Sequence, residues 1–219
     1  KSFKNLEQNL CPISIKFMAN YVPKDKDKDE PMEFGDIAMS SNGIDMLGVL
    51  KADVDHLGKM FIEGIENSRF TITRLATLSR FVDLFFSGYI ETLVRNEFNK
   101  CYCVYAGGDD LLIVGPWDMT IDLAQRISED FSKFAGGRKD IHLSAGIAFV
   151  KSKYPILDAV KLADNQLENA KGKDNDKYND KDKRNNKGRN SISIWDHAIK
   201  WEDFNKLKNI FKNLAQFLS

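Results

Sequence analysis

Apolar and polar residues alternate along most of the chain with the period of a strand or of a helix. An apolar run at 47–53 predicts a strand, and apolar positions recurring at helical spacing from 71 to 98 predict a long helix. Between Cys101 and Gly115, two strand-like runs flank a Gly-Gly-Asp-Asp turn and predict a hairpin. The elements expected next are a helix at 118–134 ended by Gly136 and Gly137, a strand at 141–150, a helix at 155–171 entered at Pro155, and a short strand at 191–195.

The order of these elements indicates the fold class. A strand, a helix, two strands, a helix and a strand, followed by another helix and strand, predict an α+β fold of the ferredoxin-like palm type (βαββαβ) with a C-terminal helix. This fold places the end of the first strand beside the hairpin tip at the centre of the sheet. The architecture hosts many unrelated activities, so function has to be argued from the site.

Three segments differ in composition from this core. Residues 1–46 include Pro23–Pro31, whose alternating charges predict a solvated loop, so we expect an N-terminal extension or linker before a palm domain at 47–198. Residues 173–187 are almost wholly polar and predict an insertion that does not pack, although transient contact with RNA or ATP phosphates is an alternative. Residues 199–219 carry an amphipathic stripe and predict a helix that covers another surface.

The predicted hairpin tip, Gly107-Gly108-Asp109-Asp110, carries the most specific chemistry. The two glycines supply the positive φ angles of a tight reversal and leave room for a phosphate to approach the backbone. Adjacent carboxylates repel each other, which raises their proton affinity unless a cation is present. A hard divalent ion such as Mg²⁺ prefers oxygen ligands of this kind. The alternative is a solvated hairpin without chemistry.

Two further acids follow the first strand. Asp53 and Asp55 are spaced i, i+2, so a strand puts both carboxylates on one face. The palm arrangement would bring Asp53 beside Asp109 and Asp110, in a three-carboxylate cluster able to hold one or two metal ions. The alternative is that Asp53 and Asp55 only cap the segment that follows them.

Composition adds limits. Of the 219 residues, 42% are hydrophobic, and 32 basic residues balance 32 acidic ones, so no overall basic field points to nucleic acid. The chain shows neither a membrane-spanning apolar stretch nor a signal-peptide core, and we expect it in the cytoplasm with no membrane partner. Cys11, Cys101 and Cys103 suggest no disulfide framework or zinc site and are expected as small core residues.

Four ordered motifs, LGVLKADVDHLG, TRLATLSRF, YAGGDDLLIVG and HLSAGIAF, together resemble the second palm domain of the large subunit of type III CRISPR effector complexes, most nearly the Csm subtype. That family is related to the GGDEF diguanylate cyclases. The resemblance implies synthesis of cyclic oligoadenylates from ATP with Mg²⁺ or Mn²⁺ once the complex has bound target RNA. It also implies, as partners, the other subunits, crRNA and target RNA through the complex, and the first palm domain of the same subunit. The last helix would then begin a helical domain, and the chain would be a fragment.

Roles for the acidic residues follow as hypotheses. Asp53 and Asp109, with the backbone carbonyl of Val54, would bind the metal ion. Asp110 would complete a second metal position or help to deprotonate a ribose 3′-hydroxyl.

Other residues would contact the nucleotide. The amides of Asp55, His56, Leu57 and Gly58 would hold the triphosphate, beside the bare Gly107 and Gly108. Lys171 would neutralise β- or γ-phosphate charge, or else it is an ordinary surface lysine at a helix C-terminus. Ser79 and Arg80 on the long helix are candidates for base preference. These nucleotide-contact candidates are Asp55, His56, Leu57, Gly58, Gly107, Gly108, Lys171, Ser79 and Arg80.

Three alternatives are weighed. A template-directed polymerase would need fingers and thumb domains that 219 residues do not hold. A diguanylate cyclase using GTP is the nearest enzyme, but the chain has Asp110-Leu111 where that family has Glu-Phe. A non-catalytic palm that only binds nucleotide or protein partners is the third, and clustered carboxylates argue against it. His56, His142 and His197 are isolated, with no His-Asp doublet, so no DNase activity is assigned to this chain.

Overall fold

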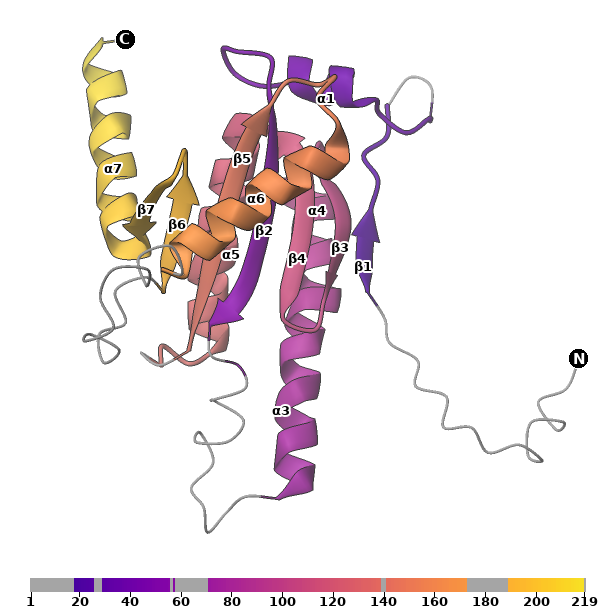
Figure 1. Cartoon of the computed structure of the whole chain (residues 1–219), viewed down its shortest axis with the longest axis vertical. Helices are drawn as coiled ribbons and strands as arrows, with labels where there is room; N and C mark the ends of the chain where they lie inside the picture. The colour runs from indigo at the N-terminus through magenta and orange to yellow at the C-terminus, as the bar shows by residue number, and fades with distance from the viewer. Residues whose placement is uncertain are drawn as a thin grey trace, which may run out of the picture.

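The computed structural model describes residues 18–25, 29–55, 57, 71–138, 141–172 and 189–218. Within these residues, seven strands form one sheet in the order β1-β3-β4-β2-β5-β6-β7 (Figure 1). All neighbouring strands are antiparallel except β5 and β6, which are parallel. The strands are β1 Ala19–Tyr21, β2 Leu47–Asp55, β3 Tyr102–Gly107, β4 Asp110–Pro116, β5 His142–Val150, β6 Ser191–Ile194 and β7 His197–Lys200.

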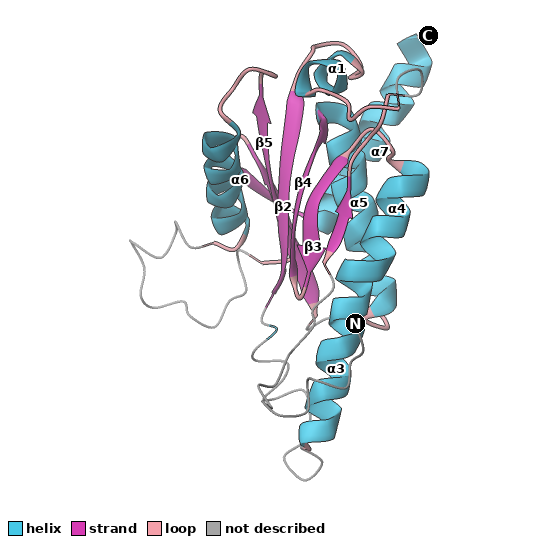
Figure 2. Cartoon of the chain, turned by 90° about the vertical axis from the view of Figure 1, so that its right-hand side faces the viewer, coloured by secondary structure: helices cyan, strands magenta, loops and turns pink. Residues whose placement is uncertain are grey.

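Helices cover both faces of this sheet. Figure 2 shows α3, α4, α5 and α7 on one side and α6 on the other, with α1 at one end of the strands. A five-residue π-helical turn, Phe85–Tyr89, joins α3 to α4, so the long helix predicted from the sequence is continuous but locally widened. The helices are α1 Phe34–Met39, α3 Ile72–Leu84, α4 Ile90–Glu97, α5 Trp117–Phe134, α6 Ile156–Ala170 and α7 Trp201–Leu218.

The central strands follow the predicted palm topology. β2, α3 with α4, β3, β4, α5 and β5 succeed one another along the chain, and the corresponding strands lie in the order β3-β4-β2-β5. This is the split βαβ arrangement, in which the first strand lies between the third and the fourth. The predicted α+β palm with a C-terminal helix is therefore confirmed.

Two apolar clusters hold the helices on the sheet. On the side of α3, α4 and α5, the cluster includes Leu50, Ala52 and Val54 of β2. On the side of α6 and α1, it includes Leu47 and Val49 of the same strand. β2 therefore alternates between two buried environments, as a central strand covered on both faces does. Cys101 and Cys103 are buried in the first cluster, where burial raises the pKa of each thiol to about 12, as expected for core cysteines.

Helix α6 lies unusually close to β5. A Cβ atom added at Gly146 of β5 would lie 2.1 Å from the backbone N of Leu167 and 2.7 Å from the carbonyl O of Ala163. No side chain fits in that space, so the helix backbone packs directly on the strand. Gly146 is the glycine of the HLSAGIAF motif, and this contact is the physical reason for it.

Three short elements were not predicted. β1 pairs with β3 and α1 buries Ile37 and Ala38, so part of the segment expected as an N-terminal extension belongs to the same sheet and core. β7 spans 197–200 and crosses the boundary proposed after residue 198. These elements are too short for a periodic pattern to show in the sequence.

The predicted C-terminal helix packs against the body of the protein. Trp201 at its start is buried, and its Nε1 donates to the carbonyl O of Leu143 at 2.7 Å. Further along α7, the Lys208 ammonium lies 2.5 Å from the Asp122 carboxylate of α5. Among the described residues, none of the helices is both long enough and apolar enough to span a bilayer.

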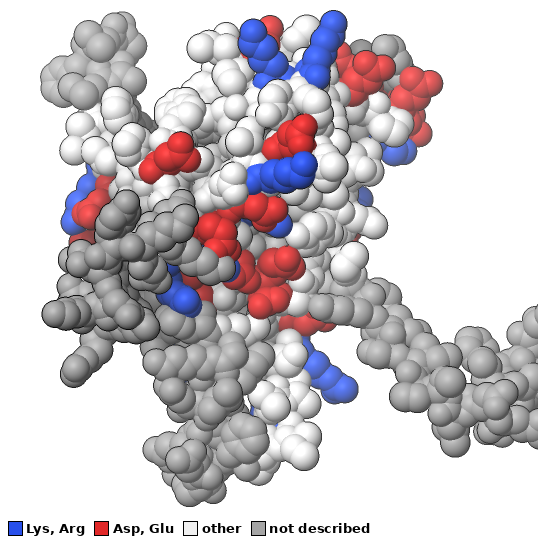
Figure 3. Space-filling model, in the orientation of Figure 1, with Lys and Arg blue, Asp and Glu red and all other residues white. Residues whose placement is uncertain are grey.

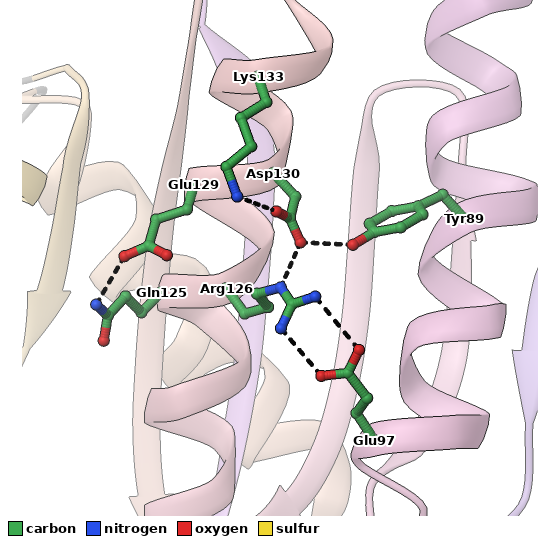
Figure 4. A network of polar contacts seen from close by, with 7 residues as sticks. All are labelled: Tyr89, Glu97, Gln125, Arg126, Glu129, Asp130 and Lys133. Atoms are coloured by element: carbon green, nitrogen blue, oxygen red, sulfur yellow. Dashed lines mark hydrogen bonds and ion pairs between the residues drawn. The ribbon is translucent and has the colours of Figure 1, made fainter.

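A polar network joins α5 to the long helix (Figure 4). The Asp130 carboxylate accepts from Tyr89 Oη at 2.5 Å, Arg126 Nε at 2.5 Å and Lys133 Nζ at 2.8 Å. Arg126 also donates to Glu97 at 3.0 Å. Burial by itself would raise the pKa of Asp130, but the hydrogen bonds from Lys133, Tyr89 and Arg126 outweigh it and lower the pKa to about 2.

We expect Gly146→Ala to lower the free energy of unfolding by about 2–3 kcal/mol, because the methyl group would press on the backbone of α6. Chemical denaturation measures the loss. Gly35→Ala is the matched control, since a Cβ there meets nothing within 4 Å and Gly35 lies in helix α1. Equal stability of the two variants would show that α6 does not depend on this contact.

We expect Asp130→Asn to destabilise the protein by about 1 kcal/mol at neutral pH, because it removes a charged acceptor from a partly solvated network. The folded pKa lies below the ordinary 3.8, so the stabilisation is present above that pH and is lost as pH falls toward about 2. Thermal melts of wild type and variant should therefore converge in acid. Asp158→Asn, in an exposed pair with Lys161, is the control and should show little difference at either pH.

Candidate active site

The β3–β4 hairpin turns through two residues, Gly108 and Asp109. Gly107 and Asp110 form the last cross-strand pair, and Gly108 has a φ of +73°. A positive φ at the first central residue alone is the pattern of a type II′ turn. The sequence predicted positive φ at both glycines, and for Gly107 this is wrong. Gly107 ends β3 in extended backbone, where a Cβ would lie 3.2 Å from Met18 Cγ.

Helix α3 contacts the hairpin tip through a hydrogen bond. Asp83, in its last turn, accepts a hydrogen bond from the backbone N of Gly108 at 2.9 Å. The base-preference candidates Ser79 and Arg80 lie about one turn earlier on the same helix and are exposed. A role of Ser79 and Arg80 in base preference therefore stays a prediction.

Strand β2 brings Asp53 to the hairpin. Asp53 pairs directly with Asp110, and the backbone N of Val54 donates to the carbonyl O of Asp109 at 3.0 Å. Directly paired residues of antiparallel strands point to the same face, so the Asp53 and Asp110 side chains are neighbours. The expected juxtaposition of the first strand and the hairpin tip is present.

Lys171, the residue that caps α6, reaches the same place. Its ammonium contacts the Asp53 carboxylate, and both side chains are largely buried. Burial raises the pKa of Asp53; Lys171 opposes this effect, and the carboxylates of Asp109 and Asp55 add to it. The position of Lys171 is therefore not that of an ordinary surface lysine.

The carboxylates do not form the predicted three-residue cluster. Among the described residues, no group of three or more His, Cys, Asp or Glu side chains is arranged to hold a metal ion. Protein groups contact one oxygen of each of two carboxylates: Lys171 contacts Asp53 Oδ2, and Tyr105 Oη donates to Asp110 Oδ2 at 3.2 Å. The donor set nevertheless fits a hard divalent ion, because it offers carboxylate oxygens whose mutual repulsion a cation would relieve.

Asp55 has a different environment from Asp53. It is 2% exposed, and its Oδ2 accepts from Ser144 Oγ at 2.7 Å and from the backbone N of Asn190 at 2.9 Å. Its Oδ1 is buried and has no hydrogen-bond partner among the residues that the structure describes. The carboxylate thus joins β2 to β5 and to the chain leading into β6, rather than facing open space.

The predicted triphosphate contacts are only partly visible. Leu57 is half-buried and packs against the larger apolar cluster. His56 and Gly58 lie outside the described residues, as does the polar insertion at 173–187.

Sequence reasoning missed three residues near the carboxylates, which are Lys51, Tyr105 and Asp164. The Lys51 ammonium lies 2.5 Å from the Asp164 carboxylate of α6, and the Tyr105 hydroxyl donates a hydrogen bond to Asp110. The pKa of Lys51 is raised because the bond to Asp164, aided by nearby acidic groups, exceeds the opposing effect of burial. Burial and the Asp110 charge likewise raise the pKa of Tyr105. A lysine inside the apolar strand VLKADV was the available signal, since such a charge needs a partner.

Acidic side chains gather on the face that carries α6, between that helix and the tip of the β3–β4 hairpin (Figure 3). Lys51 and Lys171 are the basic side chains that the ion pairs place among them. The site therefore combines carboxylates with two lysines, which suits a ligand that carries both phosphates and a divalent cation.

Comparison with known proteins gives the family of the chain. A family model described as "Cas10/Cmr2, second palm domain" matches residues 46–192. The chain belongs to this family. The site residues named above, from Lys51 to Asn190, fall inside the matched range.

Curated relatives of the Cas10 palm are named CRISPR system single-strand-specific deoxyribonuclease Cas10/Csm1 (subtype III-A). The one from Methanocaldococcus jannaschii is 36% identical over 207 residues, covering 88% of this chain and 26% of the relative. The one from Thermococcus onnurineus is 35% identical over 171 residues, covering 71% of this chain and 21% of the relative. The chain thus spans about a quarter of the length of these relatives.

Solved structures agree with the family assignment. The Csm1–Csm4 cassette in complex with cA3 matches with a TM-score of 0.73 and 29% identity, covering 87% of this chain and 28% of that one. The cassette in complex with AMPPNP matches with a TM-score of 0.72 and 29% identity, covering 91% and 30%. The resemblance to a type III CRISPR large subunit is therefore confirmed.

Proposed function

We propose that this chain is the nucleotidyl-transferring palm of a type III CRISPR large subunit and that it makes cyclic oligoadenylates from ATP within a complex activated by target RNA. The observation that carries the proposal is the pairing of Asp53 with Asp110 at the hairpin tip, beside Lys171. The family assignment supports it, because solved relatives are complexes with ATP, with pppApApA and with cA3. These three ligands correspond to a substrate, a linear intermediate and a cyclic product of one such reaction.

The carboxylates would hold the divalent ion. Asp53, Asp109, Asp110 and the carbonyl of Val54 are the proposed ligands of Mg²⁺ or Mn²⁺, which when bound would neutralise phosphate charge and favour ionisation of the attacking 3′-hydroxyl. The chain's own contribution is to fix these oxygens on two paired strands. Catalysis would then come from positioning and charge stabilisation, without a covalent enzyme intermediate.

Lys171 would serve the phosphates. In the structure its ammonium contacts Asp53, so a positive charge already lies at the edge of the carboxylate site. A polyphosphate placed there would meet this charge at short range, in a partly buried environment where charge interactions are stronger than in water.

Partners would complete the reaction. Joining two nucleotides needs an acceptor hydroxyl held about 3–3.5 Å from the donor phosphorus, and one palm offers one carboxylate site. We propose that the first palm domain of the same subunit holds the second nucleotide, with crRNA and target RNA acting through the complex. A relative of this chain is solved as a Csm1–Csm4 subcomplex in the type III-A interference complex, which supports assembly with other subunits.

We expect Asp109→Ala combined with Asp110→Ala to abolish oligoadenylate formation by the assembled complex while the melting temperature is kept. Both side chains are partly exposed at the tip, so their loss removes little packing and relieves repulsion. Chromatography with mass detection measures the product. Glu202→Ala combined with Asp203→Ala, an exposed acidic pair at the start of α7, is the control. Product from the hairpin variant at the wild-type rate would contradict the assignment.

We expect the 219-residue chain on its own to bind ATP in the presence of Mg²⁺ or Mn²⁺ but to form little or no oligoadenylate, because no second nucleotide would be held in line. Calorimetry measures the binding, and product analysis after long incubation measures the synthesis. The complex with target RNA is the positive control. Efficient synthesis by the isolated monomer would refute the shared-site mechanism.

A further inference from the structure

Strand β3 contains a β-bulge four residues before the hairpin turn. Cys103 pairs with Ile113 of β4, whereas Tyr105 pairs with Leu112, so Val104 is an extra residue on β3. The pairing of β3 with β1 shifts at the same place. Bulges often occur beside active sites, where they redirect a side chain.

The bulge changes the face on which Tyr105 lies. A regular ladder continued from Cys103 and Ile113 would place Tyr105 opposite Leu111, whose side chain is buried in the cluster under α3, α4 and α5. Because Val104 is inserted, Tyr105 instead lies opposite Leu112 and packs against the cluster on the α6 side. The two-residue turn then pairs Gly107 with Asp110.

On the α6 face, the Tyr105 hydroxyl reaches the carboxylate at the hairpin. Tyr105 Oη donates to Asp110 Oδ2 at 3.2 Å, and both side chains are partly buried. Asp110 is in turn the direct cross-strand partner of Asp53. The hydroxyl therefore restrains the carboxylate that faces Asp53, at a position where a free aspartate would have two or more staggered rotamers.

Lys51 supports the same arrangement from β2. It lies two residues before Asp53 on the same face of the strand, and its ammonium is 2.5 Å from Asp164 of α6. Its positive charge acts on both Tyr105 and Asp110. Tyr105 on β3 and Lys51 on β2 thus lie on the strands on either side of β4, which carries Asp110.

We propose that Tyr105 is a positioning residue: placed on the α6 face by the Val104 bulge, it holds the Asp110 carboxylate toward Asp53 so that both can bind a divalent ion. This role adds a residue to the proposed nucleotidyl transfer, and any effect of Tyr105 on turnover rests on that proposed function. The role itself is to restrict the orientation of the Asp110 carboxylate. Metal affinity measures this restriction without any reaction taking place.

The test compares Tyr105→Phe with Tyr102→Phe. Each change removes one hydroxyl from β3 and keeps the ring, but Tyr102 lies at the far end of the strand, with its ring centroid 6.4 Å from that of Phe34. Mn²⁺ affinity of the full chain is measured by electron paramagnetic resonance. We expect Tyr105→Phe to weaken Mn²⁺ binding about five- to tenfold, as for loss of a hydrogen bond to a charged group, and Tyr102→Phe to leave it unchanged.

A double-mutant comparison shows whether Tyr105 acts through Asp110. In an Asp110→Asn background, Tyr105→Phe should cause no further loss of Mn²⁺ affinity, because the carboxylate that it restrains is gone. In the complex with target RNA, Tyr105→Phe should lower kcat for oligoadenylate formation with little change in KM for ATP. Additive losses of Mn²⁺ affinity, or equal affinity of Tyr105→Phe and wild type, would overturn the positioning role.

The two proposals fail separately. If the wild-type complex makes no oligoadenylate while Tyr105→Phe still weakens Mn²⁺ binding, the proposed function is wrong and the positioning role stands. If wild type makes product and Tyr105→Phe matches it in kcat and in Mn²⁺ affinity, the proposed function stands and the positioning role is overturned.

Discussion

Strand β2 is held in register on both sides, by β4 from Leu47 to Asp53 and by β5 from Leu47 to Asp55. Its side chains alternate between two buried clusters, so a slip by one residue would exchange the two faces. Asp53 would then enter the apolar cluster beneath α3, α4 and α5, where an unpaired carboxylate costs several kcal/mol. The apolar residues of β2 therefore fix the position of the site, although none of them takes part in its chemistry.

Helix α6 depends on the same register. β5 pairs with β2 so that Gly146 lies opposite Lys51, and the missing side chain at Gly146 lets the helix backbone rest on the sheet. That close approach brings Asp164 within reach of Lys51 and sets Lys171 against Asp53. The two lysine contacts of the site thus depend on one backbone contact between a strand and a helix. A bulkier residue at Gly146 would displace both lysine contacts together.

Sequence reasoning recovered the elements whose pattern is long and periodic. The helix from 72 to 97, the hairpin and α5 to β6 lie close to the expected ranges, because each buries a repeated apolar face. The bulge at Val104 could not be predicted from the sequence, because a valine between a cysteine and a tyrosine is typical of a regular strand. The contacts of Tyr105 and Lys171 depend on that bulge and on a long-range helix packing, which no local pattern specifies. The metal cluster was predicted from residue types alone, and the structure shows that lysine and tyrosine partners share those oxygens.

The two acids at the end of β2 show why spacing alone does not assign chemistry. Asp53 and Asp55 are two residues apart on one face, yet the Asp53 side chain is 21% exposed and Asp55 is 2% exposed. The difference lies in what covers each one. Ser144 and the backbone at Asn190 cover Asp55 and use its carboxylate to join three segments of the chain. The contact of Asp53 on this face is the flexible side chain of Lys171, which can move when a ligand competes for the same oxygen. Of two acids that look equivalent in the sequence, the fold thus uses one to hold itself together and leaves the other partly exposed at the proposed site.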